Sequence, residues 1–271
     1  NKLISIFPLK IKNCLSNIPN EIKFSAQEIR INKTIFIICP EEVFETNIIV
    51  SKEDISDIFN VICRYSVYSF QEQLKNGFIT FNGGHRIGIA SSAVIENGKI
   101  SNIKNITSFN IRIAKEFKNC AKDLFHEIKF CSALIIGPPA SGKTTLLRDL
   151  SRILSQSKKV TIVDERSEIS AAFDGTFQMD IGRCDVLVGF PKAIGILRAI
   201  RCLSPDIVVC DEIGNLEESI AMKQCLNSGV KVIASIHAKN ETEILNKPQA
   251  LALLKIKAFE KIIILENSSL P

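Results

Sequence analysis

The chain has 271 residues, with 46% hydrophobic and 23% charged residues and a formal net charge of +5. These values are typical of a globular protein with one large or two ordinary domains, which can bury a core without disulfide bonds. The charge excess is too small to indicate a nucleic-acid or lipid partner, and no apolar run reaches the ~18–20 residues of a membrane span.

The first residues, "NKLISIFPLKIKNCL", mix apolar residues with lysines and lack the small-residue cleavage site of a signal peptide. They could form an amphipathic surface helix, but Pro8 interrupts the pattern. Nine cysteines are spread along the chain without C-x-x-C spacing, and several lie in apolar runs, such as Cys39 and Cys210. This pattern favours reduced thiols in the core of a cytosolic protein over a disulfide framework or a zinc site.

Residues 1–125 are predicted to form a smaller α+β domain. Two short strands, "EIRI" and "TIFIIC", are joined by "NK" as in a hairpin, and Ser51 with Asp54 marks the start of a helix. The stretch "VYSFQEQLK" is a second possible helix. The runs "GFITF", "HRIGIAS", "GKISNIKNI" and "SFNIRIA" then predict an antiparallel sheet.

Residues 126–271 are predicted to form an α/β domain with a mainly parallel sheet. Continuous apolar runs such as "SALIIG", "KVTIVD", "DIVVCDE", "VKVIASIH" and "EKIIILE" alternate with helical patterns near 143–154, 191–202, 216–228 and 241–253. Buried strands of this kind, separated by helices, indicate a sheet covered on both faces. Asn215 and Asn240 are predicted to cap the last two of these helices.

The motif G-x-x-x-x-G-K-[ST] appears between the first of these strands and the first helix, which is the context that a phosphate-binding P-loop requires. Glycines let the backbone approach a phosphate, and successive N–H groups at the helix start form a cradle for anions. Lys143 is expected to reach the β- and γ-phosphates of ATP, and the Thr144 hydroxyl to hold Mg²⁺. The predicted nucleotide-binding loop comprises Gly137, Pro138, Pro139, Ala140, Ser141, Gly142, Lys143, Thr144 and Thr145.

Acidic residues follow two of the predicted strands. Asp211 and Glu212 end the run "DIVVCDE", so we assign Asp211 to Mg²⁺ and Glu212 to the attacking water. Asp164 and Glu165 end the run "KVTIVD", where they could hold magnesium or orient water. These two acids could instead be surface groups paired with Arg166.

Three further residues complete the set of candidates in this half of the chain. His237 ends a fourth strand, at the same sheet edge, and could sense the γ-phosphate or the attacking water. Arg198 and Arg201 are three residues apart and share one helical face. They could meet the acids or the phosphate, or simply pack on the surface.

In this order, "GPPASGKT", "TIVDERSE", "LRAIRCLSPDIVVCDE" and "SIHA" resemble the Walker A loop, the aspartate box, the Walker B region and the histidine box of the secretion-ATPase superfamily. Together with "GFITFNGGHRIGIA" and "NIRIA" in the first half, they are most similar to a sporulation branch from endospore-forming Firmicutes. The resemblance spans nearly the whole chain. One departure is Asp211-Glu212, where the secretion motors usually have Gly-Glu.

The resemblance implies a RecA-like fold, Mg²⁺-dependent ATP hydrolysis and a homo-oligomeric ring, expected to be a hexamer. It implies peripheral association with the cytoplasmic face of the mother-cell membrane, and partners among the subunits of a membrane channel. It also implies that arginines of the N-terminal domain approach the nucleotide. Arg86 and Arg112 are the candidates, although ordinary arginines on a sheet surface would look the same.

Two other functions are compatible with the same motifs. A RecA-like motor that translocates nucleic acid would share every nucleotide-binding residue. It should also carry a basic surface rich in aromatic residues, whereas this chain has no Trp and two Tyr. A subunit that binds ATP without hydrolysing it would not need Glu212. We therefore expect no specific nucleic-acid partner, and if Glu212 proves dispensable, the water-orienting role would pass to Glu165 or Glu168.

Overall fold

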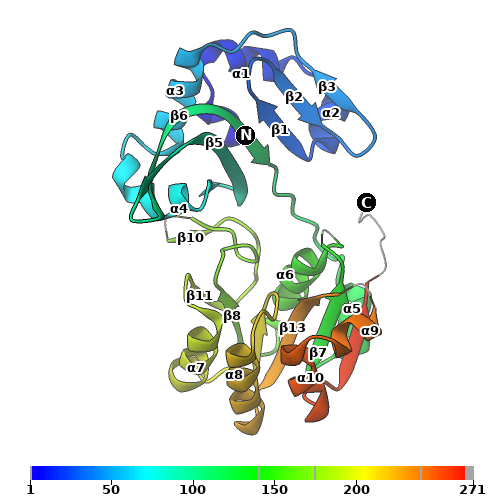
Figure 1. Ribbon diagram of the computed structural model, residues 1–271. Coiled ribbons are helices and arrows are strands. Elements are labelled where there is room, and N and C mark those ends of the chain that lie inside the picture. Colours follow the sequence, from blue (N-terminus) through cyan, green and yellow to red (C-terminus); the bar gives the residue numbers. More distant parts are fainter. Residues whose placement is uncertain (1, 140, 174, 239, 266–271) are drawn as a thin grey trace. The chain divides into compact units, whose positions relative to one another are not determined.

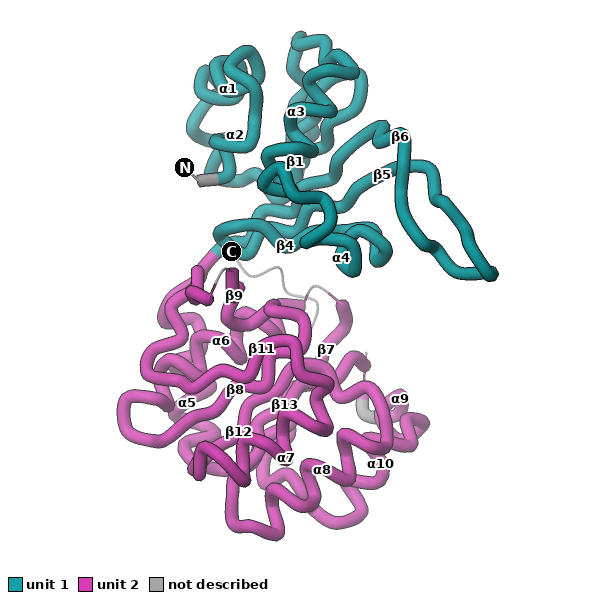
Figure 2. The backbone as a smooth tube through the Cα atoms, turned by 90° about the vertical axis from the view of Figure 1, so that its left-hand side faces the viewer, with its two compact units in different colours: residues 1–115 teal, residues 116–271 magenta. Residues whose placement is uncertain are grey.

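The computed structural model describes residues 2–139, 141–173, 175–238 and 240–265. The chain divides into two compact units, Asn1–Lys115 and Glu116–Pro271 (Figure 2). The sequence predicted a change of architecture near residue 125, and residues 116–125 belong to the second unit. In the described part of the chain, no helix combines the length and apolarity needed to cross a membrane.

The first unit is built on an antiparallel sheet with strand order β3-β2-β1-β6-β5-β4. The predicted hairpin is confirmed, because Glu28–Ile31 pairs with Ile35–Ile38. The two strands predicted over 98–114 are one strand, because a bulge, with Asn105 at φ 52°, absorbs the irregularity. The strands are β1 (Glu28–Ile31), β2 (Ile35–Ile38), β3 (Val43–Glu45), β4 (Phe78–Phe81), β5 (His85–Glu96) and β6 (Lys99–Arg112).

The helices of this unit largely follow the local signals. Ser51 and Asp54 form the predicted capping box at the start of α3. Pro8 interrupts the helical pattern of the first residues, as predicted: η1 ends at Ile6, and α1 begins at Leu9 with Pro8 as its N-cap. The helical segments are η1 (Lys2–Ile6), α1 (Leu9–Ser16), α2 (Asn20–Ser25), α3 (Lys52–Ile62), η2 (Val67–Phe70) and α4 (Gln71–Lys75).

The second unit contains a six-stranded sheet with order β11-β8-β12-β13-β7-β14, in which every neighbouring pair is parallel (Figure 1). This confirms the predicted fold class. The strands are β7 (Ala133–Gly137), β8 (Val160–Asp164), β11 (Asp185–Val188), β12 (Ile207–Cys210), β13 (Lys231–His237) and β14 (Lys261–Ile264), and a small hairpin, β9 (Ala172–Phe173) with β10 (Thr176–Phe177), stands apart from the sheet.

Helices cover both faces of this sheet. One core cluster packs α7, α8 and α10 against side chains such as Ile136 and Val208, and the other packs α5 and α6 against Ile135 and Val209. Neighbouring strand residues thus point to opposite cores, which explains why the strands are apolar throughout. The helices are α5 (Lys122–Ile128), α6 (Lys143–Leu154), α7 (Lys192–Leu203), α8 (Leu216–Asn227), α9 (Glu241–Leu245) and α10 (Pro248–Lys255).

Helix ends agree with the predicted caps. The Asn215 and Asn240 side chains accept hydrogen bonds from the amides of Glu218 and Glu243, both at 2.9 Å. The helix predicted near 241–253 is two helices, because Pro248 lacks an N–H and begins a new one. This arrangement brings the ends of β7, β8, β12 and β13 to one edge of the sheet.

Candidate functional site

The P-loop lies between β7 and α6, as the motif predicted. A Cβ on Gly137 would be 2.4 Å from the Ser141 hydroxyl, so a side chain there would force the loop apart. Gly142 has φ 85° and caps α6, a conformation that favours glycine. Pro139 is exposed, Thr145 lies in the first turn of α6, and Ala140 lies outside the described residues. The loop therefore curls tightly over the helix N-terminus, as an anion cradle requires.

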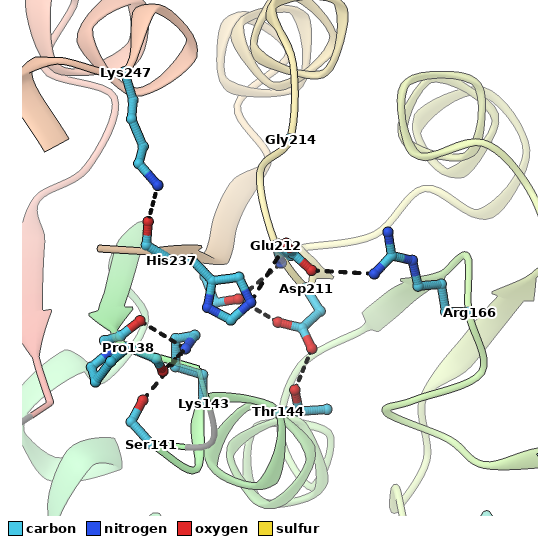
Figure 3. A network of polar contacts seen from close by, with 12 residues as sticks. Pro138, Ser141, Lys143, Thr144, Arg166, Asp211, Glu212, Gly214, His237 and Lys247 are labelled. Atoms are coloured by element: carbon cyan, nitrogen blue, oxygen red, sulfur yellow. Dashed lines mark hydrogen bonds and ion pairs between the residues drawn. The ribbon is translucent and has the colours of Figure 1, made fainter. Parts of the chain in front are cut away.

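The Lys143 side chain bends back over this loop (Figure 3). Its ammonium donates to the carbonyls of Gly137 at 2.8 Å and Pro138 at 2.6 Å, and lies 3.4 Å from the Ser141 hydroxyl. Lys143 is only 4% exposed. Burial lowers its pKa, while the nearby Asp211 and Glu212 act in the opposite direction. The loop thus holds a positive charge at the mouth of the backbone cradle.

Asp211, which follows β12, is held from two sides. One carboxylate oxygen accepts the hydroxyl proton of Thr144 from α6, and the other accepts that of Ser235 from β13. The register that pairs Cys210 with Ala234 brings β13 beside this acid. The arrangement unites the predicted metal-binding pair, Thr144 and Asp211, at one point.

Glu212 adopts a left-handed backbone conformation with φ 49°, which costs on the order of 1–3 kcal/mol for a residue other than glycine. Its amide donates to the Ser235 hydroxyl at 2.9 Å. Its carboxylate lies 3.5 Å from Nε2 of His237 and 3.4 Å from Nη1 of Arg166. The strained turn thereby presents Glu212 between the histidine and the arginine (Figure 3).

His237 lies at the end of β13, where the sequence predicted it. Its Nδ1 atom is buried and has no hydrogen-bond partner among the described residues. Lys247 donates to its backbone carbonyl and so ties the end of β13 to the segment before α10. A buried ring nitrogen without a partner is costly unless a ligand satisfies it, so the histidine retains an unused polar group beside Glu212.

The carboxylate of Asp164 is hydrogen-bonded to the loop that follows β8. Its two carboxylate oxygens accept the amides of Glu168 at 2.9 Å and Ser170 at 2.8 Å, and also the Ser170 hydroxyl at 2.6 Å. It is 3% exposed. With its oxygens committed to closing the loop after β8, the geometry gives no support to Asp164 as a magnesium ligand. Glu165, the next residue, lies 3.8 Å from Lys192.

Arg148 of α6 is a residue that sequence reasoning missed. It donates to the carbonyls of Glu168 at 2.7 Å and Ile169 at 2.6 Å, and burial lowers its pKa. It thus fastens the same loop to the helix that carries the P-loop. The signal in the sequence was a charged residue in the otherwise apolar run "LLRDL" of a predicted helix. An arginine that becomes buried there needs partners.

Lys192 and Ser235 were also missed. Lys192, in the first turn of α7, is 10% exposed and donates to the backbone carbonyls of Asp211, at 3.1 Å, and Glu212. Ser235 is fully buried inside the run "VKVIASIH", where a polar residue must find a partner. A serine between apolar residues and a lysine next to a helix-starting proline were the only signals in the sequence.

The predicted arginines lie away from this cluster or in the other unit. Arg198 and Arg201 are exposed on α7, and the Arg198 guanidinium stacks 5.2 Å from the Phe190 ring. In the first unit, Arg86 of β5 and Arg112 of β6 are directly opposite each other. Arg112 also lies 3.5 Å from Glu28.

The residues fit a nucleotide with a divalent cation. Gly142 has the left-handed backbone that starts α6 with its amides free to face an anion, and Lys143 supplies a cation beside them. Thr144 and Asp211 offer the hydroxyl and carboxylate oxygens that Mg²⁺ prefers. The side chain of Glu212 is 38% exposed, so its carboxylate can accept a proton from water.

The comparisons with known proteins agree with this geometry. The model of the family "Sporulation stage III, protein AA" matches residues 1–271. Stage III sporulation protein AA of Bacillus subtilis (strain 168) is 37% identical over 283 residues, which cover 100% of this chain and 92% of that protein. The predicted resemblance to the sporulation branch is therefore confirmed.

Solved structures share the fold. The ATPase DotB of Yersinia pseudotuberculosis has a TM-score of 0.63 at 14% identity, covering 95% of this chain and 75% of that one. The pilus retraction motor PilT, solved with bound ADP, has a TM-score of 0.61 at 14% identity, with 97% and 78% covered. At such identities the likeness supports the fold alone.

Proposed function

Because the chain belongs to the family of sporulation stage III protein AA, we propose that it is a Mg²⁺-dependent ATPase that serves as a motor or assembly factor in sporulation. The observation that carries the proposal is the contact between the Thr144 hydroxyl and the Asp211 carboxylate. These two groups come from the end of the P-loop and the end of a neighbouring strand. They meet where a P-loop enzyme holds the cation of its nucleotide.

In this proposal Lys143 leaves the carbonyls of Gly137 and Pro138 and turns its ammonium to the β- and γ-phosphates. The loop amides and the start of α6 hold the phosphate oxygens, and Thr144 and Asp211 hold the cation. Mg²⁺ held there would neutralise negative charge on the phosphates. The Asp164 carboxylate does not enter the cation site, because it closes its own loop.

Glu212 is the group that we assign to the attacking water. Its carboxylate accepts a proton from the water as the water attacks the γ-phosphorus and the bond to the bridging oxygen of the departing ADP breaks. His237 and Arg166 orient the carboxylate. The left-handed backbone at Glu212 supports this role, since such strain is found mainly at functional sites. The Nδ1 atom of His237 is also buried without a partner among the described residues, which supports a role for the histidine in the site.

We further propose that the protein works as a homo-oligomeric ring, expected to be a hexamer. The resemblance of the P-loop, aspartate-box, Walker B and histidine-box motifs to those of the secretion ATPases implies this arrangement. Arg86 and Arg112 are the candidates to approach a nucleotide, and they lie opposite each other on neighbouring strands. The ring would associate with the cytoplasmic face of the mother-cell membrane and act on channel subunits, as the family resemblance implies.

ATP turnover per subunit, measured against protein concentration with and without single-stranded DNA, tests this function. For a secretion-type ring, ATP turnover per subunit should rise with protein concentration and should not change when DNA is added. The Lys143→Ala variant should lose this activity. Turnover that is independent of concentration and stimulated by DNA would instead identify a nucleic-acid motor. No Lys143-dependent turnover at any concentration would refute the ATPase itself.

A further inference from the structure

Lys192 is a nearly buried lysine that the proposed mechanism leaves without a role. It lies in the first turn of α7, directly after Pro191, and its side chain is 10% exposed. A charged group at such depth must have partners, because transfer from water is otherwise very unfavourable. The contacts of this ammonium therefore indicate what the lysine does.

The Lys192 ammonium reaches the backbone of the turn that carries Glu212. It donates to the carbonyl of Asp211 at 3.1 Å and to the carbonyl of Glu212. It also lies 3.6 Å from the carboxylate of Glu218 and 3.8 Å from that of Glu165. One side chain thus joins α7 to the turn after β12, the start of α8 and the loop after β8.

The same turn is fastened on its other side by β13. The amide of Glu212 donates to the Ser235 hydroxyl at 2.9 Å, and the amide of Ile213 donates to the Ser235 carbonyl at 2.8 Å. The peptide groups around Glu212 are therefore held between Ser235 and Lys192. Such two-sided support is what a left-handed, non-glycine residue needs in order to persist.

We propose that Lys192 is the positioning residue for Glu212, which holds the strained turn so that the carboxylate stays beside His237 and Arg166. The proposal rests on the proposed function, since it assigns Lys192 a part in the same reaction. Lys192 acts through the backbone and touches no reacting atom. Because Lys192 belongs to α7, the position of the first turn of that helix is coupled to the turn that carries Glu212.

If Lys192 positions Glu212, its substitution should lower kcat and leave nucleotide binding nearly unchanged. Lys192→Met keeps the apolar stem but removes the donors, so kcat should fall about 100-fold, the loss that a small misplacement of a reacting group can cause. The KM for ATP and the affinity for a non-hydrolysable ATP analogue should stay within about threefold of the wild-type values. Lys192→Gln, which retains one amide donor group, should lose less of kcat than Lys192→Met.

A matched control removes a lysine from another Lys–carboxylate pair. Lys231, at the start of β13, lies 2.8 Å from Glu260. Lys231→Met should leave kcat and KM within about threefold of wild type. Hydrogen exchange supplies a readout that does not need activity. The segment 211–218 should exchange about tenfold faster in Lys192→Met than in wild type, and the segment 144–154 should not change.

These measurements distinguish failure of the inference from failure of the proposed function. A wild-type protein without Lys143-dependent turnover refutes the ATPase, and exchange of 211–218 then decides alone whether Lys192 holds the turn. Wild-type kcat in a folded Lys192→Met or Lys192→Gln protein overturns the inference. An equal loss of nucleotide affinity and kcat also overturns it, and so does failure of both variants to fold. In either case Lys192 would support the structure in general and not Glu212 in particular.

Discussion

The hydroxyl of Ser235 donates to the carboxylate of Asp211 and accepts the amide proton of Glu212, so one buried hydroxyl holds both acids of the site. We expect Ser235→Ala to lower the free energy of unfolding by about 1–3 kcal/mol, because the Glu212 amide loses its partner. Turnover should fall more steeply than nucleotide affinity.

Chemical denaturation together with steady-state ATP hydrolysis checks this prediction. Ser219→Ala is the matched control, because Ser219 is also buried but donates to the Gln249 carbonyl at 2.9 Å and makes no contact with Asp211 or Glu212 among the described residues. It should change stability without changing kcat. Equal kcat in Ser235→Ala and Ser219→Ala would remove Ser235 from the site.

Glu212→Gln should retain ATP and lose turnover about 10²–10⁴-fold, since the amide cannot accept the proton of the attacking water. Single-turnover hydrolysis and binding of labelled ATP measure the two effects separately. Glu165→Gln and Glu168→Gln serve as comparisons and should keep most of the activity. A Glu212→Gln protein with normal turnover would transfer the role to one of those two residues.

Asp164 and Asp211 should respond differently to loss of the carboxylate. Asp211→Asn should weaken Mg²⁺-dependent nucleotide binding, because the residue faces Thr144. Asp164→Asn should instead lower the free energy of unfolding by about 1–3 kcal/mol, since the loop amides lose charge-assisted acceptors. The dependence of nucleotide binding on Mg²⁺ concentration, measured at a fixed ATP concentration, compares the two variants. A weaker cation affinity in Asp164→Asn, without loss of stability, would restore Asp164 as a metal ligand.

The stability of the second unit should decline in acid partly through Asp149. Burial alone would raise the pKa of this carboxyl, but the Ala121 amide and Arg152 hold the pKa below its ordinary value of about 3.8. Since the folded-state pKa is the lower one, the stabilisation is complete above the unfolded-state value. It is lost as the pH falls through the folded-state pKa.

Asp149→Asn should therefore be less stable than wild type at neutral pH and should show a shallower loss of stability below about pH 4. The free energy of unfolding, measured in urea at several pH values, provides the test. Asp123→Asn, which removes an exposed acid in the first turn of α5, is the control. Parallel pH curves for wild type and Asp149→Asn would contradict the assignment.

Arg86 and Arg112 should matter between copies of the chain rather than for its folding. Arg112→Ala removes a partly exposed ion pair with Glu28, so its effect on stability should be about 0–1 kcal/mol. If either arginine completes a neighbouring site, its alanine variant should lose turnover that a Lys143→Ala protein restores on mixing. A mixture no more active than its components would dismiss these arginines as ordinary sheet residues.

The sequence predicted the parts of the site that local patterns encode. The P-loop, the acids after β12, the caps at Asn215 and Asn240 and the parallel sheet all follow from motifs, periodicity and short-range hydrogen bonding. Pro248 divides a predicted helix in two because α10 begins at the proline itself, with its missing N–H in the first turn.

The missed residues depend on contacts between distant segments. Lys192 meets carbonyls about twenty residues away, and Arg148 and Ser235 likewise act on loops from other elements. No spacing rule links such positions, since the order of strands in the sheet brings them together. Asp164 illustrates a second difficulty. A carboxylate at the end of a strand can accept hydrogen bonds from the following loop instead of binding a ligand, and the sequence pattern is the same in both cases.

Strand β14 has a consequence for how the protein is made. It pairs with β7, the strand that leads into the P-loop, and the Leu265 amide donates to the Ile136 carbonyl at 2.8 Å. The partners of β7, which begins at Ala133, are thus β13 on one side and β14 on the other, and these begin only at Lys231 and Lys261. On the ribosome, the residues of the P-loop are therefore translated well before the strands that flank β7. Both strands that flank β7 are thus available only after Lys261–Ile264 have been translated.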